Sequence, residues 1–358
     1  MKKKLWLPLV LSAVLLSLAG CGKQAANSST ATPSAATPSA AATATATATA
    51  TADQKTYKIA ISQIVEHPSL DATREGFLAA LKDAGITEGT NLKVDYNNAQ
   101  GDSTNNLSIA QKVASADNDL VLGIATPSAL AIVQQVKKTP VLFAAVTDPL
   151  AAKIVSSMDK PGGNVSGASD TNPEAITQLM EFIASNFPKV KSVGLVINEG
   201  EPNAVIMAKK AEEELSKHSI KLIKAAVTNT SEVKQAAESL VGRVDAFYIT
   251  LDNTVVSGVD ALLSVAKNKH IPFFSSDRDT VEKGAFATVG FKYYDHGYQV
   301  GQMAVEILKN GKNPADMKVT VPDKLDLILN LKAAADQGIE VTDAMKNAVK
   351  DPDKNIIK

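Results

Sequence analysis

Cysteine is nearly absent from this sequence of 358 residues, and the single one, Cys21, has no partner for an intrachain disulfide. The folded part must therefore depend on its hydrophobic core. An excess of charge is missing too, since the formal net charge is −1 and no basic run or aromatic-basic stripe occurs. A nucleic-acid-binding surface needs such clustered positive charge, so we expect no nucleic-acid partner.

Histidine is also scarce, and the four that occur do not have the spacing of metal ligands. They are His67, His218, His270 and His296. The sequence has no glycine loop that would cradle a phosphate and no Gly-x-Ser-x-Gly elbow. We therefore expect no metal, no cofactor and no enzymatic activity. A surface enzyme, with catalytic groups that meet only in space, is the alternative.

The N-terminal apolar run, 5–18, is shorter than the roughly 20 residues of a membrane-spanning helix. Three lysines precede it, and small residues follow it up to Cys21. This order is typical of a secretory signal. Leu-Ala-Gly-Cys at 18–21 resembles the bacterial lipobox, so we expect a signal peptide over 1–21, lipid on Cys21 and an extracytoplasmic protein anchored to the cell membrane. An uncleaved anchor with an incidental cysteine is the alternative.

Large apolar residues are almost absent from 22–56, where alanine, threonine, serine and proline dominate. Such a segment cannot bury enough surface to offset its ordering entropy, so we predict a disordered tether. The Ala-Thr repeat at 41–52 could instead be helical or glycosylated. The only tryptophan, Trp6, lies in the predicted signal, so the mature chain should contain none.

Beyond the tether, short apolar runs alternate with amphipathic stretches. Strands are expected at 58–64, 92–96, 120–124, 140–146, 192–197, 220–227, 246–250 and 272–275. Helices are expected at 69–84, 105–116, 128–137, 174–186, 203–218, 232–240 and 254–267. This alternation predicts an α/β fold with parallel sheets covered on both faces. The pattern runs twice, ending first near Val146 and starting again near Val190, so two lobes with a cleft between them are expected.

Polar residues follow the expected strands in both halves, where ligands collect in open parallel sheets. In the first half they are His67, Ser69, Thr126, Ser128, Thr147 and Asp148, and in the second half Asn198, Asp252, Asn253, Thr254 and Asp277. One half thus offers hydroxyls and helix amides, and the other offers carboxylates. That polarity would suit a zwitterion with its carboxylate on the first lobe and its ammonium group on the second.

Plain helix capping is the alternative for each of these loops, because the same residue types are preferred caps. Thr126 is expected to cap the helix that follows, leaving the amide of Ser128 pointing outward. Asp148 has the position of a cap. Asp252 and Asp277 are the best candidates for an ammonium partner.

Several stretches in order resemble the ABC-transporter substrate-binding lipoproteins of the tryptophan/tyrosine-binding type. They are HPSLD (67–71), VDYNNAQGD (94–102), IATPS (124–128), AVTDP (145–149), PGGN (161–164), VD (244–245) and DNT (252–254). The similarity covers 57 to about 331. It implies two Rossmann-like lobes joined by three crossovers, the type I periplasmic-binding-protein fold. One lobe would be 57–168 with about 292–320, and the other 169–291 with about 321–334, leaving 335–358 as a C-terminal appendage.

The resemblance also implies capture of a small solute, with an aromatic amino acid favoured. Thr126 and Ser128 would lie near its carboxylate and Asp252 near its amine, so Asp252→Ala should weaken binding at least tenfold. The candidates for an apolar slot are Ile64, Leu70, Phe143 and Phe274, each of which could instead belong to the core.

Hinge closure over the solute, followed by recognition of the closed form by a membrane ABC permease with a separate ATPase, is the mechanism that the resemblance implies. We expect a monomer. A surface sensor or adhesin of the same fold, which binds a ligand without delivering it, is the alternative function.

Overall fold

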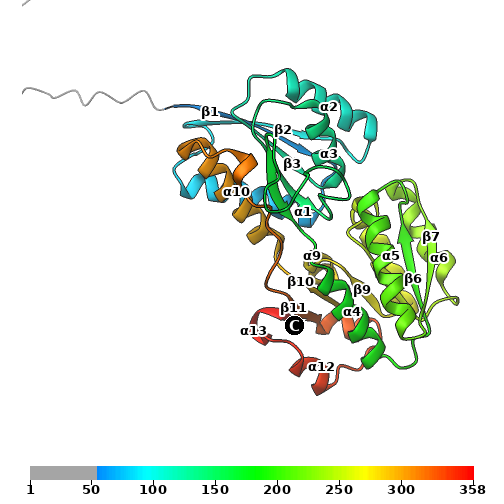
Figure 1. Ribbon diagram of the computed structural model, residues 1–358. Helices are drawn as coiled ribbons and strands as arrows, with labels where there is room; N and C mark the ends of the chain where they lie inside the picture. Colours follow the sequence, from blue (N-terminus) through cyan, green and yellow to red (C-terminus); the bar gives the residue numbers. More distant parts are fainter. Residues whose placement is uncertain (1–54) are drawn as a thin grey trace, which may run out of the picture. The chain divides into compact units, whose positions relative to one another are not determined.

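The computed structural model describes residues 55–358. The predicted signal peptide (1–21), with the lipid site Cys21, lies outside the described residues, as does nearly all of the predicted tether (22–56). Within residues 55–358, no helix combines the length and the apolar character needed to cross a membrane. Figure 1 shows this part of the chain and labels many of its elements.

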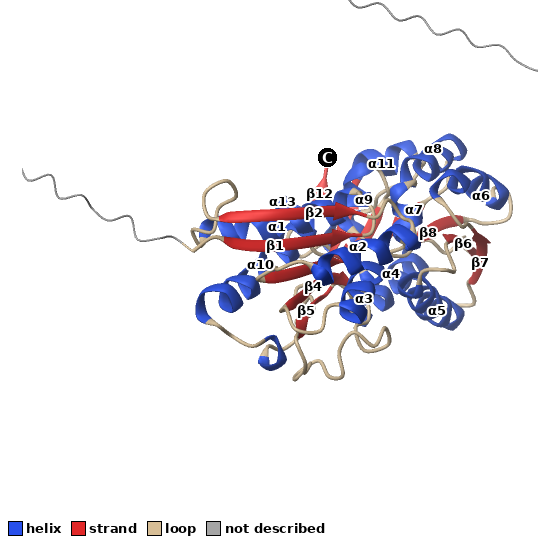
Figure 2. Ribbon diagram, turned by 90° about the horizontal axis from the view of Figure 1, so that it is seen from above, coloured by secondary structure: helices blue, strands red, loops and turns tan. Residues whose placement is uncertain are grey.

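The first lobe is built on a sheet of five parallel strands in the order β2-β1-β3-β4-β5. These are β1 (Tyr57–Gln63), β2 (Leu92–Asn98), β3 (Leu120–Ile124), β4 (Val141–Val146) and β5 (Val165–Ser169). The helices are α1 (Pro68–Asp83), α2 (Ser103–Ser115), α3 (Thr126–Gln135) and α10 (Tyr293–Asn310), with a 3₁₀ turn η2 (Pro314–Asp316). Side chains of α1 and α10 pack in one core cluster and those of α2 and α3 in another, so helices cover both faces of the sheet (Figure 2).

Glycines allow α10 to pack directly against α1. A Cβ on Gly76 would meet the backbone of Tyr294, and a Cβ on Gly297 would overlap the carbonyl oxygen of Thr73. Gly301 is confined in the same way. Only glycine permits so close an approach. These positions therefore allow α10, which comes late in the sequence, to pack against α1 on the sheet of the first lobe.

The second lobe is built on a seven-stranded sheet in the order β12-β11-β10-β9-β8-β6-β7. The strands are β6 (Ser192–Ile197), β7 (Lys221–Ala226), β8 (Ala246–Ile249), β9 (Phe273–Ser275), β10 (Ala287–Gly290), β11 (Asp326–Asn330) and β12 (Ile356–Ile357). All neighbours are parallel except β10 and β11. The helices are α4 (Pro173–Asn186), α5 (Pro202–Lys217), α6 (Val233–Leu240), α7 (Asn253–Ser257), α8 (Val259–Lys269), α9 (Arg278–Lys283), α11 (Leu331–Asp336), α12 (Asp343–Asn347) and α13 (Pro352–Asn355), with a 3₁₀ turn η1 (Thr230–Glu232).

The chain passes between the two lobes at three points. It leaves the first sheet after β5, returns to it between β10 and α10, and leaves it again between Thr320 and β11. Thr320 is still bridged to Ala168 of β5, which places the last passage immediately after it. The α/β fold with parallel sheets in two lobes that the sequence predicted is confirmed.

Four strands were not expected from the sequence: β5, β10, β11 and β12. Strand β5 reads Val-Ser-Gly-Ala-Ser and has no apolar run, although it is buried throughout. The last residues, expected as an appendage over 335–358, pack against the second lobe. Met345 and Val349 join its core, and β12 pairs with β11.

Candidate functional site

A pocket, here called the polar pocket, lies where residues of both lobes meet. Its lining comprises His67, Ser69, Leu70, Thr126, Ala145, Thr147, Asp170, Asn203, Leu251, Asn253, Val256, Asp277 and Tyr293. In the first lobe these follow the C-terminal ends of β1, β3 and β4, where parallel sheets bind ligands. No lysine or arginine of residues 55–358 lines this pocket.

Two hydrogen bonds join the lobes at the polar pocket. Ser69 Oγ donates to Asp277 Oδ1 at 3.1 Å, and His67 Nε2 lies 3.4 Å from Asn253 Oδ1. All four side chains are buried. Because these contacts require the lobes to be close together, the described arrangement is a closed one.

His67 presents an acceptor to the polar pocket. Asn253 uses its Nδ2 to donate to Glu201, so its Oδ1 accepts and His67 Nε2 carries the proton. Burial lowers the pKa of His67, against the opposing field of Asp277, so the ring is neutral and Nδ1 has a lone pair. Nδ1 is buried and has no hydrogen-bond partner among the described residues.

Asn203, at the start of α5, offers a second buried acceptor. Its Nδ2 donates to Glu201 and to the carbonyl oxygen of Leu251. Its Oδ1 has no partner within residues 55–358, although the side chain is buried. An unpaired buried acceptor is costly, so a donor from a bound molecule is the natural partner for this oxygen.

Asp170 is the least expected member of the polar pocket. It accepts hydrogen bonds from Tyr293 Oη at 3.0 Å and from Thr171 Oγ1 at 3.1 Å. Burial raises the pKa of Asp170 from 3.8 to about 6, although these hydrogen bonds oppose the shift. Asp170 was not a candidate from the sequence because it follows β5, a strand that was not expected, and Tyr293 was not one because it follows β10, which was not expected either.

The helices that face the polar pocket differ between the lobes. No side chain caps α1 at His67 or α3 at Ala125. In the second lobe, Asp252 accepts from the Val255 amide of α7, and Asp277 accepts from the Thr280 amide of α9. The first lobe therefore offers helix amides, whereas the second lobe combines the uncapped start of α5 with the carboxylate of Asp277.

Asp252 does not lie where it could bind the amino group of a ligand. Its carboxylate accepts from the amides of Asn198 at 2.6 Å and Val255 at 3.1 Å, and the residue is fully buried. Burial raises its pKa, and the nearby carboxylate of Glu201 adds to this shift. It does not line the polar pocket. The structure therefore gives Asp252 the capping role that the sequence left as the alternative.

The remaining sequence candidates divide between structural roles and a neighbouring groove. Thr126 is the first residue of α3, not its cap, and its Oγ1 accepts from the Thr147 amide at 3.3 Å. Ser128 Oγ donates to Asn106, and Asp148 caps the turn after β4. Asn198 and Thr254 bond to each other and line a separate groove outside the polar pocket.

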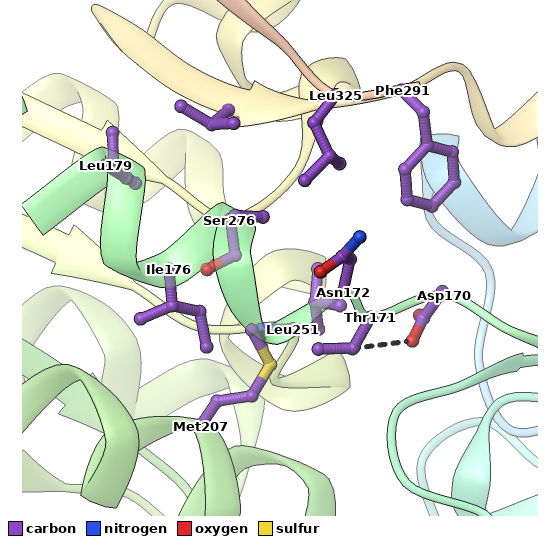
Figure 3. Close-up of a pocket in the computed structure, with 13 residues that line it drawn as sticks. Asp170, Thr171, Asn172, Ile176, Leu179, Met207, Leu251, Ser276, Phe291 and Leu325 are labelled. Atoms are coloured by element: carbon purple, nitrogen blue, oxygen red, sulfur yellow. Dashed lines mark hydrogen bonds between the residues drawn. The ribbon is translucent and has the colours of Figure 1, made fainter. Parts of the chain in front are cut away.

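A second cavity, here called the hinge pocket, adjoins the polar pocket through Asp170 and Leu251, which line both. Figure 3 shows its lining. Its walls are Asp170, Thr171, Asn172, Ala175, Ile176, Leu179, Met207, Leu251, Ser276, Val289, Gly290, Phe291 and Leu325. Most of these are apolar, and none carries a positive charge.

Of the expected slot residues, only Leu70 lines the polar pocket. Ile64 lines the neighbouring groove. Phe143 and Phe274 have no exposed surface and belong to the cores of their lobes. Phe274 contacts Phe286 edge to face, with ring centroids 5.9 Å apart. The sequence does not distinguish a core residue of this kind from a residue that lines an apolar ligand slot, because both kinds are apolar and lie in or near strands.

A family model described as "ABC transporter substrate binding protein" matches residues 58–351. The tyrosine-binding protein of Clostridioides difficile (strain R20291) is 40% identical over 277 residues, which is 77% of this chain and 79% of that protein.

Two solved structures show how the lobe arrangement compares. The ABC domain from Streptococcus pneumonia in complex with L-Trp is 31% identical, with a TM-score of 0.78 over 85% of this chain and 100% of that one. The ligand-free, open structure of a substrate-binding protein with adhesive properties from Clostridium difficile is 38% identical, with a TM-score of 0.61 over 84% of this chain and 98% of that one. The arrangement is thus more similar to that of the complex, although the sequence is more similar to the open protein.

Proposed function

Because this chain belongs to the ABC transporter substrate-binding protein family, we propose that it captures an aromatic amino acid for an importer by closing two lobes around it. The observation that carries this proposal is the set of buried acceptors in the polar pocket. Asp170, Asn203 and His67 line it, Asn203 Oδ1 and His67 Nδ1 have no partner among the described residues, and no lysine or arginine of residues 55–358 lines it. An α-ammonium group supplies three donors and the missing positive charge.

The opposite wall suits the ligand's carboxylate. The uncapped N-termini of α1 and α3 present backbone amides and the positive end of the helix dipole. Ser69, Thr126 and Thr147 of the first lobe also line the polar pocket. A zwitterion bound with its carboxylate toward the first lobe would meet favourable charge at both ends.

The energy available matches a small ligand of this class. Burying an aromatic side chain of about 150–250 Å² at about 25 cal/mol per Å² contributes roughly 4–6 kcal/mol. Charge-assisted hydrogen bonds add roughly 1.5–3 kcal/mol each. Against an association cost of at least about 4 kcal/mol, a micromolar or tighter dissociation constant is attainable. One relative is a tyrosine-binding protein, and another was solved in complex with L-Trp. Both favour an aromatic amino acid as the ligand.

Hinge closure is supported by the hydrogen bonds between the lobes and by the greater similarity to the tryptophan complex than to the open relative. In this mechanism the open form binds the solute on one lobe, and the closed form is recognised by the permease. The proposed lobe bounds are 57–168 with about 292–320, and 169–291 with about 321–334, to which residues 335–358 are added because they pack into the second lobe.

We also propose that the chain is exported, lipidated on Cys21 and held at the outer side of the cell membrane as a monomer, with 22–56 as its tether. The support is the sequence pattern at 1–21. Metabolic labelling with a fatty acid, comparing the wild type with Cys21→Ser, tests this. Labelling of Cys21→Ser at the wild-type level would contradict it.

Binding of the twenty amino acids and common sugars to the mature protein, measured by calorimetry, tests the ligand class. Tryptophan can also be followed by its own fluorescence, because the mature chain has no tryptophan of its own. We expect tyrosine or tryptophan to bind at micromolar concentration or below. Binding of sugars without binding of amino acids would overturn the proposal.

Adhesion is a second candidate function, because one relative at 38% identity is a substrate-binding protein with adhesive properties. Uptake of a labelled aromatic amino acid, in cells with and without this chain, separates the two roles. Loss of uptake without the chain supports transport. Unchanged uptake combined with weaker attachment to a surface would favour adhesion.

A further inference from the structure

The hinge pocket is formed by the segments that connect the two lobes. Thr171 and Asn172 come from the first passage between the lobes, Phe291 from the second and Leu325 from the third (Figure 3). Its floor is the second lobe, with Ile176 of α4 among the contributors. A group bound here would touch all three passages at once.

Most polar groups of the hinge pocket are already bonded within the protein. Thr171 Oγ1 donates to Asp170. Asn172 donates from Nδ2 to the Pro322 carbonyl oxygen and accepts at Oδ1 from the Glu174 amide. The pocket therefore presents chiefly the apolar surfaces of its aliphatic side chains, which suits an apolar body better than a charged one.

Ser276 is the exception. Its Oγ lies 2.6 Å from the Tyr248 hydroxyl, and Tyr248 is fully buried. Among the described residues, Tyr248 Oη makes no other hydrogen bond. Ser276 Oγ is therefore the acceptor for the hydroxyl proton of Tyr248. Tyr248 then donates, and Ser276 keeps its own hydroxyl proton and a lone pair for a molecule in the hinge pocket.

We propose that the hinge pocket receives the aromatic ring of the ligand, and that the Tyr248–Ser276 hydroxyl pair recognises a polar group on that ring. This inference rests on the proposed function, since the amino group must first occupy the adjoining polar pocket. A phenol can accept from Ser276, and an indole can donate to it. A phenyl ring can do neither, and it leaves the hydroxyl proton of Ser276 without an acceptor.

Relative affinities for tyrosine, tryptophan and phenylalanine, measured by calorimetry on the mature protein, test the proposal. We expect the wild type to prefer tyrosine and tryptophan to phenylalanine. Ser276→Ala should reduce that preference by about tenfold, the effect of one hydrogen bond, and leave phenylalanine binding nearly unchanged. Ser216→Ala, at an exposed serine of α5, is the matched control and should behave as the wild type does.

Leu179→Phe provides a second test that does not depend on the hydroxyl pair. The larger side chain narrows the hinge pocket, so tryptophan affinity should fall more than tyrosine affinity. Melting temperatures of both variants verify folding.

The outcomes separate the two proposals. If the wild type binds aromatic amino acids while both variants keep its affinities and preferences, the ring lies elsewhere and this inference fails alone. If the wild type binds no aromatic amino acid, the proposed ligand class fails and the inference fails with it.

Discussion

Ser69 Oγ donates a hydrogen bond to Asp277 Oδ1 at 3.1 Å, and in doing so joins the first turn of α1 to the cap of α9. The same carboxylate accepts from the Thr280 amide and from Ser275 Oγ. The second lobe therefore holds Asp277 in position whether or not Ser69 is near. Closure adds the last hydrogen bond to an acceptor that is already oriented.

Ser69→Ala should weaken ligand binding by about tenfold, because the closed form loses a charge-assisted hydrogen bond while the open form loses nothing. Calorimetry measures the affinity, and small-angle scattering with and without ligand measures closure. Ser115→Ala, at an exposed serine of α2, is the control. Wild-type affinity in Ser69→Ala would mean that this bond does not contribute to closure.

Asp170 should make ligand binding dependent on pH. Its pKa of about 6 in the folded protein lies above its ordinary 3.8, so a falling pH protonates it near 6 and removes the charge that an ammonium group needs. We expect affinity to decrease as the pH falls from about 7 to 5. Asp170→Asn should bind weakly at all pH values in that range and lose the dependence. Asp117→Asn, at an exposed carboxylate, is the control.

The effect of Asp170 on stability has the opposite sign to its effect on binding. A raised carboxyl pKa means that the unfolded chain releases its proton first, so the free energy of unfolding decreases as the pH rises from about 4 to about 6. Urea unfolding at several pH values shows whether Asp170→Asn removes this decrease. A decrease of unchanged size in the variant would contradict the assignment.

His296 should stabilise the protein only while it is neutral. Its Nε2 accepts from the Ala145 amide at 3.0 Å, and burial lowers its pKa to about 4. The unfolded chain binds the proton near 6.5, so stability should fall as the pH drops from about 6.5 to about 4, by on the order of 3 kcal/mol. His296→Gln keeps an acceptor without the titration, and its stability should lack this part of the pH dependence.

Gly297→Ala should lower the free energy of unfolding by about 1–3 kcal/mol, because the added methyl group overlaps the Thr73 carbonyl and forces α10 away from α1. Denaturant unfolding measures the change. Gln302→Ala, at an exposed site on the same helix, should be close to neutral. Equal stabilities of the two variants would show that the two helices separate without cost.

Asp252→Ala should lower the free energy of unfolding and change the affinity for ligand only slightly. This revises the expectation drawn from the sequence. The substitution removes the α7 cap and leaves the Asn198 amide without its acceptor, at a cost of about 2 kcal/mol. Ligand affinity of the folded fraction should change less than tenfold. A larger loss of affinity at unchanged stability would return Asp252 to the binding site.

The sequence predicted those parts of the fold that have a local signal. Strands β3 and β4 are continuous apolar runs and lie where expected. Strand β5 is buried because it lies between β4 and the passage to the second lobe. Its sequence, Val-Ser-Gly-Ala-Ser, contains no apolar run that would predict a strand. Asp170, immediately after it, was therefore overlooked.

Part of the candidate site was also predicted, because the ends of strands have a local signal in the sequence. Residues at strand ends, such as Ser69 and Asp277, were recognisable as polar groups near a cleft. The direction of each side chain was not: Asp252 and Asp277 both cap short helices, yet only Asp277 also reaches the other lobe. Such differences arise from tertiary packing, which one sequence does not show.

The pairing of β12 with β11 has a consequence for the binding cleft. Arg278, next to Asp277, donates to Asn355 Oδ1 at 2.6 Å and to the Lys354 carbonyl oxygen at 2.7 Å. The segment that carries a cleft carboxylate is thus fastened by residues 354–355, which are distant from it in the sequence. Disturbing this far end of the second sheet should therefore loosen Asp277 without altering any residue of the cleft.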